Sequence, residues 1–442
     1  MSKKMRIVAA TLATVSLVAI CGHATERADA KNALAAEKSA TEETVYDMVD
    51  LSFFDLARYD NAKYLQYYWE NEVMYNESAM IVKNADGTLD PVKLLYKPER
   101  IISVRSADLT VKYEEGVDYK LGKGVLTVLP TGKIPVLDYN KMYFNTKPTV
   151  GAIGGTDGNG YFPTVDGKYE KYVEAGILYD YQIAVSYTHS GGGNYTVPQT
   201  QSEKVSRFIG KLEKGESVNI VCLGDSISNG SNASGFFSNK LNPCMPTYFG
   251  MFGDYIKAKY GYKNVYLYES AAEYVADGAN EETRIKMTNF SVGGKDTYWG
   301  LEQTEAVSAV KPDLVILGFG MNDGSAYTSA QEYYKNMAKL VEEIRAENPL
   351  CEFVVIGTML PNANLCWKEG GKSVLGNQEA YLDQLKTLCN QKKGVALADI
   401  TTLHKEYLTV KNYRDMTGNN INHPNDFLVR LYAQTIVKTI FG

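Results

Sequence analysis

The second half of the chain alternates short apolar runs with amphipathic, helix-like segments. The helical spacing is clearest in one segment that places several apolar residues on one face: Tyr333, Met337, Leu340, Val341 and Ile344. Apolar runs on either side of such segments cover residues 218–223, 265–268, 314–317, 353–356 and 395–397. Continuous apolar strands that alternate with helices predict an α/β fold, in which a three-layer, doubly wound parallel sheet is covered by helices on both faces.

The first half has a different pattern. Short runs rich in tyrosine and β-branched residues recur between residues 46 and 189, and turn-forming sequences such as Asn-Ala-Asp-Gly at 84–87 separate them. Short strands at this spacing predict an antiparallel β-sandwich, whose tyrosines either fill its core or bind glycan. A glycine-rich stretch within residues 190–200 predicts a joint, so we expect a sandwich domain at 46–189 and a second domain at 201–442.

The N-terminus has the pattern of an export signal. Lys3, Lys4 and Arg6 precede a mostly apolar, uncharged stretch at residues 7–20, which is too short to span a bilayer. We therefore predict a signal peptide at 1–30, a linker at 31–45, and a secreted or cell-surface protein. Cys21 raises the alternative of a lipid anchor, but Ile20 is not the small residue that lipoprotein signals carry before the cysteine.

Charge and cysteine spacing exclude several partners. The net charge is −6 and no basic run is present, so neither nucleic acid nor anionic lipid is an expected partner. No later segment is apolar for long enough to span a membrane. The cysteines after Cys21 lack Cys-x-x-Cys spacing, so no metal site is expected, while a bridge such as Cys244 to Cys366 stays open.

Polar residues gather where the predicted strands end. Gly224-Asp225-Ser226 follows the first apolar run, Asn-Phe-Ser-Val-Gly-Gly stands at 289–294, and Asn322 lies in a polar turn at 318–324. Ligands of parallel sheets bind beyond the carboxyl ends of the strands. Ser226 is thus either a nucleophile or a helix cap, and the other two segments taken singly are ordinary polar turns.

A serine nucleophile requires a base, and the chain has 4 histidines. His23 lies in the predicted signal, His189 next to the glycine-rich joint, and His404 within a helical pattern. His423 precedes a proline and therefore projects from a loop before the last helix. Because Ser226 would need a base as a nucleophile, we favour the interpretation of His423 as a general base over that of a surface histidine.

These four segments, in this order, resemble the blocks of the SGNH (GDSL-like) hydrolase superfamily, over roughly residues 217–442. The resemblance implies that Ser226 is the nucleophile and His423 the general base. It also implies an oxyanion hole formed by the backbone amides of Ser226 and Gly294 and the side-chain amide of Asn322. Such donors face the oxygen on which negative charge develops in acyl transfer.

One position departs from the superfamily pattern. Asn420 stands where the family usually has the aspartate that orients the histidine. An amide can hold an imidazole ring but does not stabilise an imidazolium as a carboxylate does. Some carbohydrate esterases of the superfamily use a Ser-His dyad with a backbone carbonyl as orienter. We favour that arrangement and keep Asn420, Asp415 and Asp426 as the alternative side-chain orienters.

The export signal and the domain order resemble bacterial carbohydrate esterases that carry a jelly-roll-like sandwich before the hydrolase. This implies a serine esterase that removes short acyl groups, above all acetyl, from acylated polysaccharide without a metal or organic cofactor. Trp299 and Trp367 flank the site in sequence and either stack on a sugar or pack in the core. The alternatives are a lipase or phospholipase, which would show an apolar lid, and a non-catalytic glycan-binding protein.

Overall fold

The computed structural model describes residues 59–442 except 156–157, 175, 237–240, 264 and 269–284. The predicted signal peptide, the linker and Cys21 lie outside these residues. Within the described part of the chain, no helix is both long and apolar enough to cross a bilayer.

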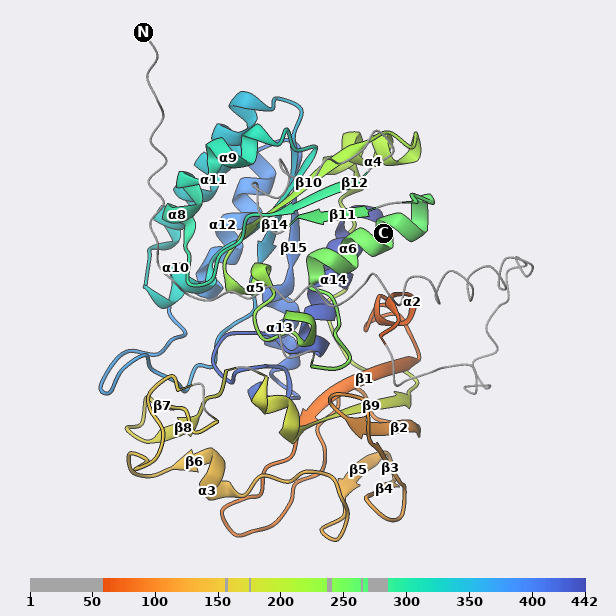
Figure 1. The fold of residues 1–442 in the computed structure, drawn as a ribbon, viewed down its shortest axis with the longest axis vertical. Helices are drawn as coiled ribbons and strands as arrows, with labels where there is room; N and C mark the ends of the chain where they lie inside the picture. Colours follow the sequence, from red (N-terminus) through yellow and green to blue (C-terminus); the bar gives the residue numbers. More distant parts are fainter. Residues whose placement is uncertain (1–58, 156–157, 175, 237–240, 264, 269–284) are drawn as a thin grey trace, which may run out of the picture.

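The C-terminal part is built on a six-stranded sheet whose strand order is β11-β12-β10-β13-β14-β15 (Figure 1). All neighbouring strands in this sheet are parallel. Their bounds are Val218–Gly224 (β10), Val265–Tyr268 (β11), Ile285–Asn289 (β12), Leu314–Gly318 (β13), Glu352–Gly357 (β14) and Val395–Asp399 (β15). This order places β10 and β13, which precede Ser226 and Asn322, side by side.

Helices cover both faces of this sheet, because successive side chains of its buried strands point to opposite faces. Val221 and Leu223 of β10 pack in one core cluster, whereas Ile220 and Cys222 pack in the other. The first face is covered by α8 (Thr297–Glu302), α9 (Thr304–Ala309), α11 (Ala330–Glu347) and α12 (Gln378–Gln391). The second is covered by α4 (Ser206–Glu213), α6 (Tyr248–Tyr260), α13 (Ile400–Tyr407) and α14 (Asp426–Phe441). The predicted three-layer, doubly wound fold is confirmed.

The N-terminal part consists of antiparallel sheets, as predicted. The largest has the order β1-β9-β2-β3, and two smaller ones have the orders β4-β5 and β6-β8-β7. The bounds of the first sheet are Val73–Met80 (β1), Arg100–Ser106 (β2), Lys112–Tyr113 (β3) and Gln182–Thr188 (β9). Those of the smaller sheets are Tyr119–Gly122 (β4), Val125–Val128 (β5), Tyr143–Phe144 (β6), Tyr161–Pro163 (β7) and Tyr169–Lys171 (β8). This part also contains two single-turn α-helices, α2 (Asn61–Tyr64) and α3 (Tyr139–Met142), and a 3-10 helix at Ile177–Tyr181.

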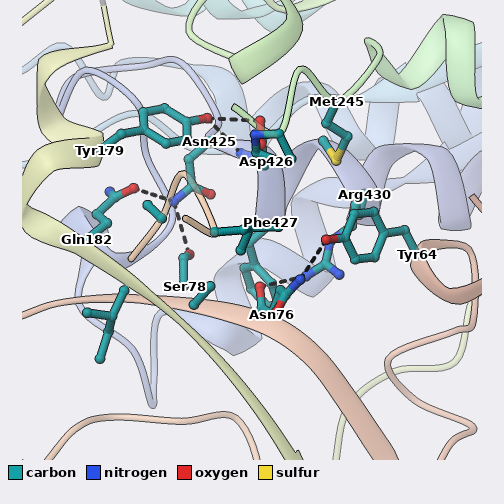
Figure 2. A pocket seen from close by; sticks show the side chains of 15 residues that line it. Tyr64, Asn76, Ser78, Tyr179, Gln182, Met245, Asn425, Asp426, Phe427 and Arg430 are labelled. Atoms are coloured by element: carbon teal, nitrogen blue, oxygen red, sulfur yellow. Dashed lines mark hydrogen bonds between the residues drawn. The ribbon is translucent and has the colours of Figure 1, made fainter. Parts of the chain in front are cut away.

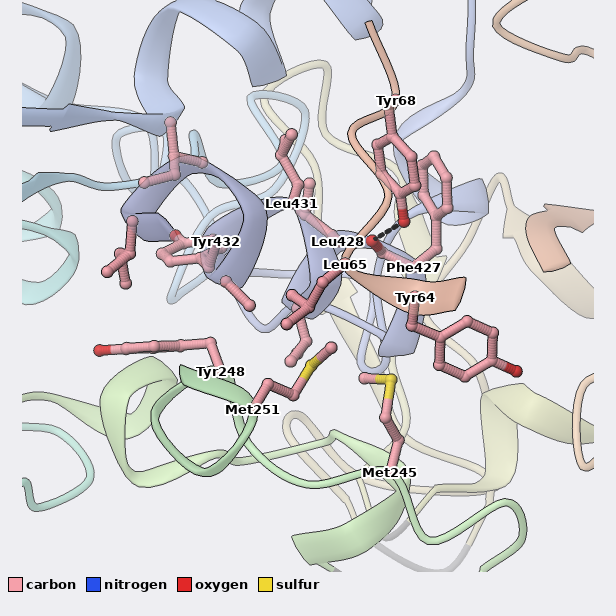
Figure 3. Packing of buried hydrophobic residues seen from close by; sticks show 14 of the residues in the cluster. Tyr64, Leu65, Tyr68, Met245, Tyr248, Met251, Phe427, Leu428, Leu431 and Tyr432 are labelled. Atoms are coloured by element: carbon pink, nitrogen blue, oxygen red, sulfur yellow. Dashed lines mark hydrogen bonds between the residues drawn. The ribbon is translucent and has the colours of Figure 1, made fainter. Parts of the chain in front are cut away.

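Many tyrosines of the N-terminal part are buried in a core that continues into the C-terminal part: Tyr64, Tyr68, Tyr75, Tyr96, Tyr113, Tyr119 and Tyr187. Figure 3 shows this continuity, with Tyr68 stacked on Phe427 of α14 and its hydroxyl donating to the Phe427 carbonyl at 2.8 Å. A fully buried ion pair between Glu77 and Lys411, 2.6 Å apart, also joins the two parts. Because residues before 190 and after 200 share one core, the domain boundary at 190–200 stays a prediction.

No disulfide bond joins the cysteines of the described residues. Cys222, Cys351, Cys366 and Cys389 are free thiols. The Cys366 thiol donates to the Gly371 carbonyl at 3.3 Å, so a bridge between Cys366 and Cys244 is not formed.

Candidate active site

Ser226 stands at the carboxyl end of β10 on a tight strand-to-helix turn. It is the first residue of α5 (Ser226–Asn229), and the Asp225 carboxylate caps this short helix by accepting the Ile227 amide at 2.9 Å. Gly224 is required at the turn, since a Cβ there would lie 2.4 Å from the Gly318 carbonyl oxygen. Helix α5 lies at the end of the sheet that faces the N-terminal part (Figure 1).

His423 lies in the loop before α14, and its ring contacts the predicted nucleophile. The distance from His423 Nε2 to Ser226 Oγ is 2.8 Å, which is a hydrogen bond. The loop is held by the side-chain oxygen of Asn419, which accepts the backbone amides of Ile421, Asn422 and His423. The structure thus brings together two residues that are 197 positions apart in the chain.

The other ring nitrogen of His423 has an asparagine partner. Nδ1 lies 2.6 Å from Asn232 Oδ1 and 2.9 Å from Asn419 Nδ2. Both hydrogens of the Asn419 amide have other acceptors, the side-chain oxygens of Glu174 and Asn422. When Nε2 accepts from Ser226, the ring hydrogen is on Nδ1 and is donated to Asn232. Asn232 therefore fixes the tautomer in which His423 can act as a base.

The three side chains predicted as orienters are engaged elsewhere among the described residues. Asn420 donates to the Glu170 carboxylate and the Lys171 carbonyl, and Asp415 accepts the Met80 and Asn412 amides. Asp426 lines a pocket between α14 and the N-terminal strands, where it accepts from the Tyr179 hydroxyl at 2.9 Å (Figure 2). The structure assigns the ring contact to the Asn232 side chain instead, and not to a backbone carbonyl.

The predicted oxyanion donors come from two neighbouring turns. Asn322 lies in α10 (Met321–Ser325), directly after β13, and its side-chain amide donates one hydrogen to the Lys295 carbonyl at 2.8 Å. This bond ties Asn322 to the turn that holds Gly294 and leaves its second amide hydrogen available. Gly294 has φ +74°, in the left-handed region that glycine favours. The backbone amides of Ser226 and Gly294 have no acceptor among the described residues.

The electrostatics suit a histidine that is neutral at physiological pH. Burial lowers the pKa of His423, and the nearby Glu174 carboxylate opposes that effect. Burial also raises the pKa of Asp225 to about 7 and that of Asp323 to about 6. Asp323 accepts from the Thr297 hydroxyl at 2.5 Å and so connects α10 to α8. Both carboxyl groups hold the turns around Ser226 and Asn322 in place.

The other described histidines do not approach this site. His404 is fully buried, and its Nδ1 accepts the Leu360 amide at 3.0 Å. His189 accepts the Gly191 amide at 3.1 Å and stacks on Tyr96 in the N-terminal part. Burial lowers the pKa of His404 to about 3 and that of His189 to about 4.

Comparison with known families identifies a match for the C-terminal part. Residues 222–427 match the model of the GDSL-like Lipase/Acylhydrolase family. The chain carries a GDSL-like hydrolase domain. The match begins within β10 and ends in the first turn of α14, so the GDSL-like domain includes Ser226, Gly294, Asn322 and His423.

Solved structures similar to the chain include three esterases. A two-domain esterase active on acetylated mannans, co-crystallised with mannopentaose, is 16% identical, with 54% of this chain and 53% of that chain covered and a TM-score of 0.38. A catalytic mutant of an acetylxylan esterase from Geobacillus stearothermophilus is 16% identical (51% and 95% covered, TM-score 0.37). A carbohydrate esterase family 3 protein from Talaromyces cellulolyticus is 18% identical (50% and 94%, TM-score 0.35). The chain thus spans about half the length of the two-domain esterase, and no curated protein matches it.

Three packed aromatic rings lead from the surface to Glu174, which lies near His423. Trp367, in the loop after β14, is 44% exposed and packs edge-to-face on Phe162, which in turn packs edge-to-face on Tyr172. The Tyr172 hydroxyl donates to Glu174, next to His423. Trp299, by contrast, is half-buried against the core of the α11 face. Of the two tryptophans predicted near the site, Trp367 is the exposed one.

Three residues around His423 were missed from the sequence. Asn232 follows the Gly-Asp-Ser motif closely, and its φ of 66° is of a kind that asparagine tolerates well. Nothing in the spacing connects it to a histidine so far along the chain. Asn419 lies close to His423 in sequence but carries no distinctive pattern. Glu174 belongs to the N-terminal part, and only the packing of that part against the GDSL-like domain brings it to the site.

Proposed function

We propose that the protein is an exported serine esterase that removes short acyl groups, above all acetyl, from polysaccharide. The GDSL-like domain belongs to a class of ester hydrolases. The observation that carries the proposal is the 2.8 Å contact between Ser226 Oγ and His423 Nε2 within this domain. A serine hydroxyl becomes an effective nucleophile when such a base accepts its proton.

In the proposed acylation step, Ser226 Oγ attacks the ester carbonyl carbon while His423 Nε2 takes the hydroxyl proton. The carbonyl oxygen gains negative charge in the tetrahedral intermediate and is stabilised by the amides of Ser226, Gly294 and Asn322. His423 then gives its proton to the departing sugar oxygen as the bond between that oxygen and the carbonyl carbon breaks. The products are the free sugar hydroxyl and an acyl group bound to Ser226.

Deacylation repeats the step with water. His423 takes a proton from the water molecule, whose oxygen attacks the acyl carbonyl through the same tetrahedral geometry. Collapse of the intermediate returns the proton to Ser226 Oγ and releases the carboxylic acid, which is acetic acid for an acetylated substrate.

Two features of the surface support a sugar as the alcohol part of the substrate. Trp367 presents an exposed indole ring at the outer end of the three packed aromatic rings, and sugar rings stack on such surfaces. The turn with Val292, Gly293 and Gly294, next to Ser226, is exposed and so offers a surface to a bulky alcohol group.

The experiment that tests the proposal measures acetate released from acetylated xylan, mannan, pectin and peptidoglycan, together with hydrolysis of p-nitrophenyl esters. We expect acetate from at least one polymer and much faster cleavage of acetyl than of octanoyl esters. Faster octanoyl cleavage would favour a lipase instead. Binding to a polymer without release of any acid would point to a non-catalytic glycan-binding protein.

Trp367→Ala is expected to raise KM for the acetylated polymer while leaving hydrolysis of p-nitrophenyl acetate unchanged. Loss of a stacked sugar should cost about 1 kcal/mol, or roughly fivefold in KM, whereas a small aryl ester does not reach the ring. Leu350→Ala is a suitable control, because Leu350 is also exposed but precedes β14, at the opposite end of the sheet. Equal KM values for wild type and Trp367→Ala would remove Trp367 from the substrate site.

A further inference from the structure

The N-terminal part places a carboxylate beside the ring of His423. Glu174 Oε1 lies 3.8 Å from His423 Nδ1, and the two side chains are 26% and 12% exposed. Glu174 stands between β8 and β9, outside the GDSL-like domain, which begins at residue 222. A carboxylate within 4 Å of the His423 ring is therefore supplied by the N-terminal part.

Glu174 is held in this place by two hydrogen bonds. The Tyr172 hydroxyl donates to Glu174 Oε1, and Asn419 Nδ2 donates to the same oxygen at 3.1 Å. Asn419 also accepts the His423 backbone amide, so one side chain links the carboxylate to the histidine loop. The position of Glu174 is thus coupled to the position of the ring.

A negative charge at this point can stabilise a protonated His423, which the neutral Asn232 side chain does not. His423 becomes an imidazolium when it takes the Ser226 proton, and the neutral Asn232 amide orients the ring without balancing that charge. A carboxylate about 4 Å away in a largely buried site attracts the imidazolium appreciably. The attraction exists only while the ring is protonated, as it is in the transition state for acylation.

We propose that Glu174 is a positioning residue that completes the Ser226–His423 pair from the N-terminal part, by stabilising the imidazolium through space and holding the loop through Asn419. This inference rests on the proposed esterase function. Glu174 would take the place of the aspartate that is missing at position 420. The activity of the GDSL-like domain would then depend on the N-terminal part.

Other ionisable groups around the histidine loop have separate partners. They are Asp225, Glu170, Arg414, Asp415, Tyr179 and Asp426. Asp225 accepts the Ile227 amide, and Arg414 donates to the Tyr143 hydroxyl. Asp426 accepts from Tyr179 and the Ser234 amide, Glu170 accepts from Asn420, and Asp415 accepts backbone amides. Among the described carboxylates, Glu174 is the one found within 4 Å of a His423 ring nitrogen.

The first test is the pH profile of kcat/KM for Glu174→Gln with p-nitrophenyl acetate. The plateau rate should fall about tenfold, because the imidazolium loses its counter-charge. The acid limb should move to lower pH, since removing the carboxylate lowers the pKa of His423 further. Glu369→Gln removes an exposed carboxylate paired with Lys147 and should leave both features unchanged.

A second measurement does not depend on ester hydrolysis. The pKa of His423 can be followed by NMR of histidine-labelled protein, with the resonance assigned by its absence in His423→Gln. The His423 pKa should be lower in Glu174→Gln than in wild type, and Asn232→Asp in the same background should raise the pKa again and recover much of the rate. Loss of rate with an unchanged acid limb and His423 pKa would overturn the proposal, as would an unchanged rate. Absence of hydrolysis by the wild type would instead overturn the esterase function.

Discussion

Ser226→Ala is expected to reduce hydrolysis of p-nitrophenyl acetate by about ten-thousandfold or more, and His423→Ala by a similar factor. Removing either member of a nucleophile–base pair removes the covalent pathway, so the two losses do not add in the double variant. The measurement is kcat/KM for the two single variants and the double variant, with thermal unfolding as a check that each is folded.

Ser231→Ala is the matched control, since it makes the same chemical change in the segment that follows α5. A fluorophosphonate probe adds a direct readout, because it should modify the wild-type protein at Ser226 and leave Ser226→Ala unlabelled. Substantial activity in Ser226→Ala would show that another nucleophile is at work. Labelling of a different serine would identify it.

The sequence contained enough information for the fold and for the Ser226–His423 pair. Short apolar runs such as residues 218–223 are typical of buried strands, and the helical periodicity around Tyr333 indicates a face that is covered by the sheet. Because parallel strands end at the same edge, polar turns after neighbouring strands meet in space. This geometry brings the Gly-Asp-Ser turn next to the turn with Asn322, which the strand order confirms.

The surroundings of His423 could not be predicted from the same patterns. Asn420 occupies the position of the family's aspartate, yet its φ of 68° and its bonds to Glu170 and Lys171 direct its side chain away from the ring. Asn232 and Glu174 reach the histidine through loop conformation and through packing between the two parts. Neither is a property of a periodic pattern, so only the folded structure reveals these contacts.

The same limit applies to the division of the chain. The sequence predicts a sandwich domain at residues 46–189, and this boundary stays a prediction. The sequence does not reveal that Tyr64, Tyr68 and Phe427 share one core or that the ion pair between Glu77 and Lys411 is fully buried. Removing one partner of a buried ion pair is costly, since the remaining charge is left without compensation. We therefore expect the GDSL-like domain to need the N-terminal part for its stability and, through Glu174, for its activity.

Asn232→Gly is expected to lower turnover by about a thousandfold, because the ring hydrogen on Nδ1 loses its acceptor and His423 no longer keeps the required tautomer. Glycine is the suitable replacement, since Asn232 has a φ of 66°, which strains other side chains but not glycine. Asn232→Asp should keep activity level or raise it, because a carboxylate accepts the same hydrogen and also stabilises the imidazolium. The measurement is kcat for p-nitrophenyl acetate in each folded variant.

Asn420→Gly provides the matched control, as Asn420 has nearly the same backbone geometry, with φ 68°. Its side chain holds the buried Glu170 carboxylate and does not contact the ring, so its loss should lower the melting temperature while turnover per folded molecule changes little. Asp415→Ala and Asp426→Ala should likewise affect stability more than turnover, because both carboxylates bind elsewhere. A thousandfold loss in Asn420→Gly or in either aspartate variant, with Asn232→Gly nearly unaffected, would return the role of orienter to the position predicted from the sequence. The reverse pattern would establish a histidine that is oriented by an amide from the nucleophile's own loop.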